Sequence, residues 1–142
     1  MLTLAMIKPD AVQAANTGKI LAHLEQEGFV VRAARLVKLT TTQAEAFYEV
    51  HRARPFYRPL VTFMTSGPVL ALALERENAV LHLRDVIGAT DPAEAKPGTI
   101  RQRYARSKEQ NAIHASDSPE TAAREVAFFF SGGELRDLSP PR

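Results

Sequence analysis

Residues 111–118 place one imidazole, that of His114, at the end of a short apolar run and follow it with small hydrogen-bonding residues. Free histidine has a pKa of about 6.5, so near neutral pH much of it is unprotonated and can attack without the activation that a hydroxyl needs. The segment therefore suits a nucleophilic histidine. It also suits a histidine that only caps a turn, because the Ser-Asp-Ser-Pro run from Ser116 is typical of a helix start.

A carboxylate further along the chain could orient this imidazole. In a helical projection Glu125 falls on the border of the apolar stripe of the last expected helix, and an inward carboxylate needs a partner. A carboxylate bonded to the His114 imidazole, directly or through a hydroxyl such as that of Ser116, would fix the tautomer and orientation of the ring. The alternative is an exposed ion pair of Glu125 with Arg124 or Lys108, since such pairs form easily.

A histidine nucleophile is suited to accepting a phosphoryl group, because that chemistry requires positioning and positive charge more than a strong base. Three cations could supply the charge: Lys8 follows the first expected strand, Arg84 lies near a helix end, and Arg101 follows a long loop. None is specific alone, because most lysines and arginines are solvated surface residues. Residues 17–20 lack the upstream glycine and the Ser/Thr of a P-loop, and no G-x-G-x-x-G run occurs.

Length and composition limit what the chain can be. Its 142 residues, 45% of them hydrophobic, suit one domain over residues 1–142, with residues 131–142 as a peripheral tail. The sequence has no cysteine, no apolar run long enough to span a membrane and no basic export signal, so we expect a cytoplasmic protein without membrane association. A net charge of +2 does not indicate general nucleic-acid binding.

Hydrophobic periodicity predicts four strands that alternate with helices. The expected strands span residues 2–7, 29–39, 68–74 and 112–114, and the expected helices span residues 17–27, 42–51, 78–87 and 119–130. Thr42 with Glu45 predicts a capping box for the second helix, residues 55–59 are expected to be irregular, and residues 88–100 a long loop. This order favours an α/β (α+β) two-layer sandwich with helices covering one face of a small sheet, and it leaves the strand order open.

Six motifs give the chain a specific resemblance. They are Ile-Lys-Pro-Asp at 7–10, Arg-Pro-Phe at 54–56, Thr-Ser-Gly-Pro at 65–68, Gly-Ala-Thr-Asp-Pro at 88–92, Pro-Gly-Thr-Ile-Arg at 97–101 and the segment 111–118. From about residue 3 to residue 133, in order and nearly without gaps, the chain resembles nucleoside diphosphate kinases. The resemblance implies a ferredoxin-like fold with a four-stranded antiparallel sheet covered by helices. It also implies ping-pong transfer of the γ-phosphate of a nucleoside triphosphate, typically ATP, to a nucleoside diphosphate through a phosphohistidine, which maintains NTP and dNTP pools.

The resemblance assigns a role to each matching residue. His114 would be the nucleophile, phosphorylated on Nδ1, and Glu125 and Ser116 would hold its ring. Phe56 would stack on the base, which implies use of purine and pyrimidine nucleotides, since every base has a π face. The phosphate path would be lined by Lys8, Tyr48, Arg84, Thr90 and Arg101, and the ribose would be reached by Lys8 and Asn111. Mg²⁺ would be the cofactor, bound mainly through the nucleotide phosphates without a protein cage.

The sequence departs from the family pattern at two positions. Ala115 replaces the glycine often found after the nucleophile, which is tolerated unless the backbone there needs a positive φ. Lys108 stands where the family usually has an aliphatic residue near the base, so we expect slightly altered base affinity and retained activity. The resemblance also implies a homo-oligomer, and a chain that ends soon after Asp137, like the shorter bacterial members, leaves tetramer and hexamer open.

Two other functions compete with phosphoryl transfer. Residues 101–108 mix four basic residues with one aromatic, and such a patch can follow the phosphates of a nucleic acid. However, a four-stranded RNA-binding domain should carry aromatic residues on adjacent strands, and residues 2–7 and 112–114 have none. The other alternative is a catalytically inactive regulatory subunit of the same fold, against which the presence of His114 and of every matching phosphate residue argues.

Overall fold

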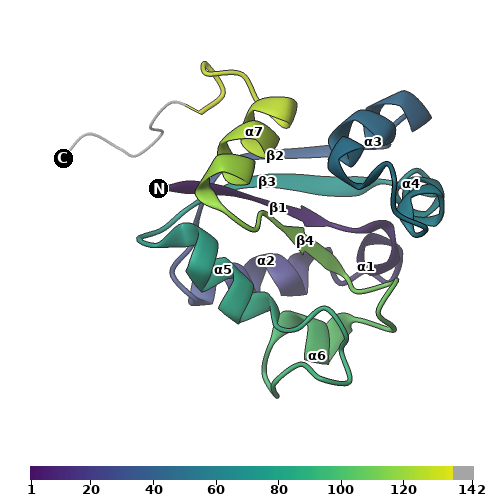
Figure 1. Cartoon of the computed structure of the whole chain (residues 1–142). Helices are drawn as coiled ribbons and strands as arrows, with labels where there is room; N and C mark the ends of the chain where they lie inside the picture. The colour runs from purple at the N-terminus through teal and green to yellow at the C-terminus, as the bar shows by residue number, and fades with distance from the viewer. Residues whose placement is uncertain (136–142) are drawn as a thin grey trace.

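The structure, a computed structural model, describes residues 1–135, so residues 136–142 of the expected tail lie outside the described part. Four strands form one antiparallel sheet in the order β2-β3-β1-β4 (Figure 1). Their bounds are β1 Leu2–Ile7, β2 Val30–Val37, β3 Val69–Glu75 and β4 Ile113–Ala115. The order that periodicity left open thus places β4, which carries His114, at one edge of the sheet beside β1.

Helices lie on both sides of this sheet, above and below it in Figure 1. Their bounds are α1 Pro9–Gln13, α2 Thr17–Gln26, α3 Thr41–Phe47, α4 Tyr57–Met64, α5 Ala79–Ile87, α6 Ile100–Tyr104 and α7 Pro119–Phe129, with a 3₁₀ turn at Glu49–His51. Leu4 and Met6 of β1 pack in one apolar cluster with α3, α4 and α7, whereas Ala5 and Ile7 pack in another with α2 and α5. Because strand side chains alternate between faces, helices cover both faces, where the element order predicted one.

Continuous apolar runs mark the central strands. β1 and β3 are buried along almost their whole length, as expected for strands that are covered on both faces. The edge strand β2 instead has exposed and half-buried residues. The strand predicted at residues 2–7 is confirmed with its bounds, and the one predicted at 29–39 is confirmed but shorter at both ends. The strands predicted at 68–74 and 112–114 each lie one residue further along.

The predicted capping box of Thr42 with Glu45 is wrong. The Thr40 hydroxyl accepts the Gln43 N–H at 3.1 Å, and the Gln43 side chain accepts the Thr40 N–H at 2.9 Å. The helix α3 therefore starts at Thr41, one residue earlier than expected. Glu45 forms an ion pair with Arg58 instead. The α-helix ends at Phe47, and only a 3₁₀ turn continues to His51.

Three helices were missing from the sequence prediction. α4 begins within the segment 55–59 that was expected to be irregular. A helix can start there because Pro59 lies in its first turn, where the backbone N–H groups have no helical partner to lose. α1 and α6 have five residues each, too few for apolar periodicity to appear. Both short helices follow motifs that position the site: α1 begins directly after Lys8, and α6 contains Arg101.

The predicted start of the last helix is confirmed in detail. Ser118 and Thr121 form a capping box, and Pro119 occupies the first helical position. Only three residues therefore separate the end of β4 from the start of α7, and α7 packs across β1. This short connection brings the buried face of α7 next to the residues of β4. Among the helices described in residues 1–135, none is long and apolar enough to cross a membrane.

Candidate active site

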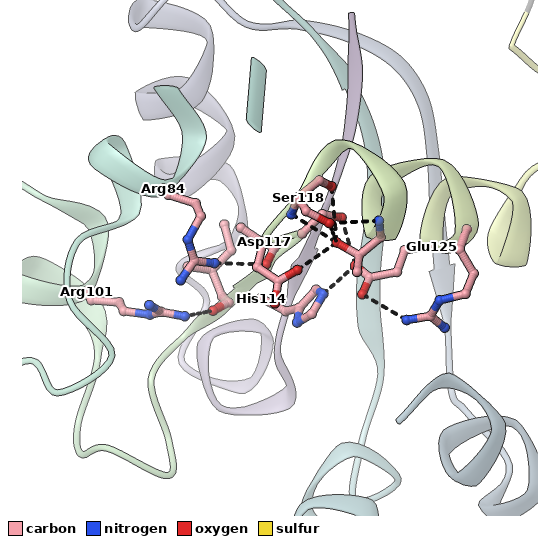
Figure 2. A network of polar contacts seen from close by, with 11 residues as sticks. Arg84, Arg101, His114, Asp117, Ser118 and Glu125 are labelled. Carbon is pink, nitrogen blue, oxygen red and sulfur yellow. Dashed lines mark hydrogen bonds and ion pairs between the residues drawn. The ribbon is translucent and has the colours of Figure 1, made fainter. Parts of the chain in front are cut away.

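The imidazole of His114 is held by a buried carboxylate. His114 Nε2 lies 2.7 Å from Glu125 Oε1 (Figure 2). The Ser116 hydroxyl donates to the same oxygen at 2.7 Å. Ser116 is fully buried, whereas the His114 side chain remains 19% exposed. Within residues 1–135 no group forms a hydrogen bond with His114 Nδ1. The ring is thus fixed from one side, and its second nitrogen is available.

Glu125 points inward from α7. Burial alone would raise the pKa of its carboxyl, but hydrogen bonds from His114 and Ser116, together with the charges of His114 and Arg124, bring that pKa below its usual value. The Arg124 guanidinium contacts the other carboxylate oxygen at 3.6 Å. Glu125 is therefore a buried anion with three partners. The alternative was right that Arg124 pairs with Glu125, and it was wrong that this carboxylate is exposed.

Aromatic rings form a wall beside the imidazole. The Phe47 ring meets His114 edge to face with 5.3 Å between centroids, and the Tyr48 ring does so at 6.1 Å. The Tyr48 hydroxyl is buried, with no hydrogen-bond partner among residues 1–135, and its burial, followed by the charge of Glu125, raises its pKa. His51 links Tyr48 to the exposed ring of Phe56, whose centroid lies 5.2 Å from it.

Two arginines lie on the other side of His114 (Figure 2). Arg84 donates to the Ala115 carbonyl at 3.3 Å, and Arg101 donates to the Ile113 carbonyl at 2.7 Å. Arg101 also binds the carbonyl of Gly88 at 3.0 Å. Burial, followed by the charge of Arg84, lowers the pKa of Arg101 to about 10. The two guanidinium groups thus hold the carbonyls on either side of His114 and concentrate positive charge there.

Lys8 approaches from the end of β1. Its ammonium donates to Asn111 Oδ1 at 2.8 Å, and Asn111 in turn donates to the Thr90 carbonyl at 3.4 Å. Lys8 is buried, and its pKa is lowered to about 8, first by burial and then by the charge of Arg101, against the opposing charge of Asp10. The structure therefore connects Lys8, Asn111 and Thr90, which are scattered in the sequence.

The surface of residues 1–135 has two cavities, of which the first includes a site residue in its lining. One of about 490 Å³ lies beside Arg84 and includes Thr99 in its lining, and one of about 440 Å³ lies beside Pro55. Neither is lined by His114. Lys108 is exposed, and in the described part of the chain no three acidic or imidazole side chains gather as a metal cluster.

Two residues next to the site were not predicted from the sequence. Phe47 forms part of the wall around the imidazole, and an apolar residue on a helix gives no signal that separates such a wall from ordinary core. Asp10 accepts the Ala112 N–H at 3.1 Å, and its place in the first motif was the available signal. The positive φ that would have made Ala115 unfavourable occurs instead at Ala112, where φ is +73°.

The fold and this arrangement define a class: an α/β-sandwich enzyme with a fixed imidazole on an edge strand, where two arginines and a lysine bind the strand and the turn before it, which suits phosphoryl transfer through nitrogen. Within that class the chain belongs to the nucleoside diphosphate kinase family, whose sequence model matches residues 2–135.

Relatives and solved structures agree with this assignment. The chain is 55% identical over 133 residues to the nucleoside diphosphate kinase of Sorangium cellulosum, covering 94% of this chain and 92% of that protein. Its structure is similar to the Aquifex aeolicus nucleoside diphosphate kinase, with a TM-score of 0.93, 48% identity, and 95% and 98% of the two chains covered. The halophilic enzyme of Halobacterium salinarum in complex with CDP matches with a TM-score of 0.94 and 37% identity, over 99% and 93%.

Proposed function

We propose that His114 is the residue through which this nucleoside diphosphate kinase passes the γ-phosphate from a nucleoside triphosphate to a nucleoside diphosphate. One observation carries the assignment: Nε2 is 2.7 Å from the Glu125 carboxylate, whereas Nδ1 has no hydrogen-bond partner among residues 1–135. A neutral imidazole has one protonated nitrogen, so a proton held on Nε2 by Glu125 leaves the lone pair on Nδ1. Nδ1 is therefore the nucleophilic atom.

The reaction has two symmetrical steps. Nδ1 attacks the γ-phosphorus, the N–P bond forms, and the bond to the bridging oxygen breaks, so the nucleoside diphosphate leaves with that oxygen. A β-phosphate oxygen of a second nucleoside diphosphate then attacks the phosphohistidine and restores the imidazole. In both steps the N–H on Nε2 donates to Glu125, and the carboxylate stabilises the positive charge that the phosphorylated ring acquires.

Positive charge for the phosphates comes from Lys8, Arg84 and Arg101. A guanidinium has five N–H donors, and the structure gives Arg101 three hydrogen bonds to carbonyls, so the group has donors left for a phosphate. Tyr48 and Thr90 complete the phosphate path. We propose that Mg²⁺ enters as part of the nucleotide substrate, because this ion is usually held by phosphates with few protein ligands.

The nucleoside would lie toward the exposed end of the row of rings. Phe56 is 48% exposed and can stack on a base, and Asn111 with Lys8 can reach the ribose. Because stacking does not depend on base identity, we expect purine and pyrimidine nucleotides to be used alike. We also propose that residues 1–142 form one domain, and that it acts in the cytoplasm as a homo-oligomer, either a tetramer or a hexamer.

Labelling with γ-labelled ATP and Mg²⁺ tests the proposal. Wild type should acquire acid-labile, base-stable label that moves to GDP on a chase. His114→Ala should bind nucleotide but take no label, and His23→Ala, a matched change on α2, should behave as wild type. Turnover in His114→Ala at the wild-type rate would overturn the assignment of His114.

A further inference from the structure

The backbone is strained two residues before His114. Ala112 has a φ of +73°, in the left-handed region that residues with a Cβ rarely occupy. The Ile113 N–H donates to the Asn111 carbonyl at 2.9 Å, so residues 111–113 form a three-residue γ-turn. A γ-turn with a positive central φ is the rare, strained form, and it persists only where surrounding contacts hold it.

The segment after β1 binds the N–H and the carbonyl of Ala112. The Asp10 carboxylate accepts the Ala112 N–H at 3.1 Å, and the Lys8 N–H donates to the Ala112 carbonyl at 2.9 Å. Arg101 binds the carbonyls of the two residues on either side of Ala112. Among residues 1–135, Asp10 is therefore the side chain that holds the central N–H of the strained turn.

Stability does not explain a carboxylate at this place. Asp10 is 4% exposed, and its Oδ1 has no hydrogen-bond partner in the described part of the chain. A buried carboxylate with so few partners is unfavourable for folding, because the anion has lost its water without full compensation. Its hydrogen bond with Ala112 instead ties the turn that leads into His114 to the segment that carries Lys8.

We propose that Asp10 is a positioning residue, whose carboxylate holds the turn of residues 111–113 so that Lys8 and His114 act on the same phosphoryl group. The inference rests on the proposed function of His114. Asp10 touches neither the imidazole nor the Lys8 ammonium through a hydrogen bond in this structure, so it acts through the backbone of Ala112.

The charge of Asp10 has a second effect, which supplies a readout. The groups that act on the buried Lys8 ammonium are Arg101 from α6, which lowers its pKa, and Asp10 from α1, which raises it. With both present the pKa is about 8. Removal of the Asp10 charge should therefore lower the pKa of Lys8 further and discharge it closer to neutral pH.

Two variants separate position from charge in assays of ATP-to-GDP transfer over a range of pH. Asp10→Asn keeps an oxygen for the Ala112 N–H and removes the charge, so kcat is retained while kcat/KM falls at a lower pH than in wild type. Asp10→Ala removes the accepting oxygen and the charge. Its kcat should fall by about 100-fold, because the reacting groups are then misplaced. Glu25→Gln, an exposed carboxylate on α2, is the matched control. The proposal would be overturned if both variants had the wild-type kcat and their kcat/KM fell at the same high pH as in wild type.

Hydrogen exchange of the Ala112 amide tests the same proposal without an activity assay. The Ala112 amide should exchange slowly in wild type and Asp10→Asn and rapidly in Asp10→Ala, and equal exchange in all three would overturn the proposal. If Asp10→Ala does not fold, the comparison of wild type with Asp10→Asn remains, and rapid exchange of the Ala112 amide in either protein would overturn the proposal. A wild type that forms no phosphohistidine would instead refute the proposed function, and these measurements would still test the turn.

Discussion

Glu125→Gln tests what the buried carboxylate contributes to the reaction. Glutamine keeps the size of the side chain and one oxygen to accept from Ser116 and His114, so the main change is loss of the negative charge. Hydrogen bonds to charged groups are worth about 1.5–3 kcal/mol, against about 1 kcal/mol for neutral ones. Loss of the charge alone therefore costs the difference, about 0.5–2 kcal/mol, and the rate of phosphohistidine formation should fall by about 2- to 30-fold, at 1.36 kcal/mol for each factor of ten.

The assay is a rapid-quench single turnover with excess MgATP, which follows phosphorylation of the protein before any acceptor is added. Thermal unfolding of the same variant separates a catalytic effect from a folding effect. Ser116→Ala is a useful comparison, because it removes a hydrogen bond to the carboxylate and leaves the charge in place. Wild-type phosphorylation rates in a folded Glu125→Gln would refute the idea that the carboxylate stabilises the charged ring.

Three further predictions concern separate parts of the molecule. Gly88→Ala should destabilise the fold by about 2–4 kcal/mol in a denaturant titration, since φ there is +89° and a Cβ would lie 2.6 Å from the Thr99 hydroxyl. Gly18→Ala, where a Cβ meets nothing within 4 Å, should be neutral or stabilising, and equal losses in both variants would contradict this reasoning. The kcat/KM for nucleotide should fall as pH rises through about 8, because Lys8 loses its proton there. Lys8→Arg should move that fall to higher pH, and an unmoved midpoint would exclude Lys8 as the group responsible. Lys108→Val should alter the KM values and base preference without loss of kcat, and unchanged values would show that position 108 does not contact the base.

Long periodic elements were predictable from the sequence, and short ones were not. β1, β3, α2, α5 and α7 could be predicted because each buries several apolar residues at a fixed period. α1 and α6 are too short to show a period, and their formation depends on tertiary packing and on the turns before them. The start of α3 was misplaced because the segment has three successive threonines, and Thr40 rather than Thr42 provides the cap.

Some contacts of the site were likewise predictable from the sequence, and others were not. The approach of Glu125 to His114 followed from an acidic residue at the border of an apolar stripe, since a carboxylate in that position needs a partner. The convergence of Lys8, Arg84 and Arg101 depended on strand order, which local periodicity does not contain, and only the resemblance to a known family predicted it. The role of Asp10 depends on a backbone angle at Ala112, and no side-chain pattern reveals that angle.

The contacts around His114 join segments from opposite ends of the chain. Lys8 directly follows the first strand, Arg101 lies in a helix beyond the middle of the chain, and Glu125 lies in the last helix; each reaches the neighbourhood of β4 through tertiary contacts. An internal partial unfolding that detaches α7 would leave the imidazole in place but without its carboxylate. Phosphotransfer should therefore report on tertiary structure. During gradual denaturation, activity should disappear before the β-sheet structure does, because the weakest of these three connections opens first.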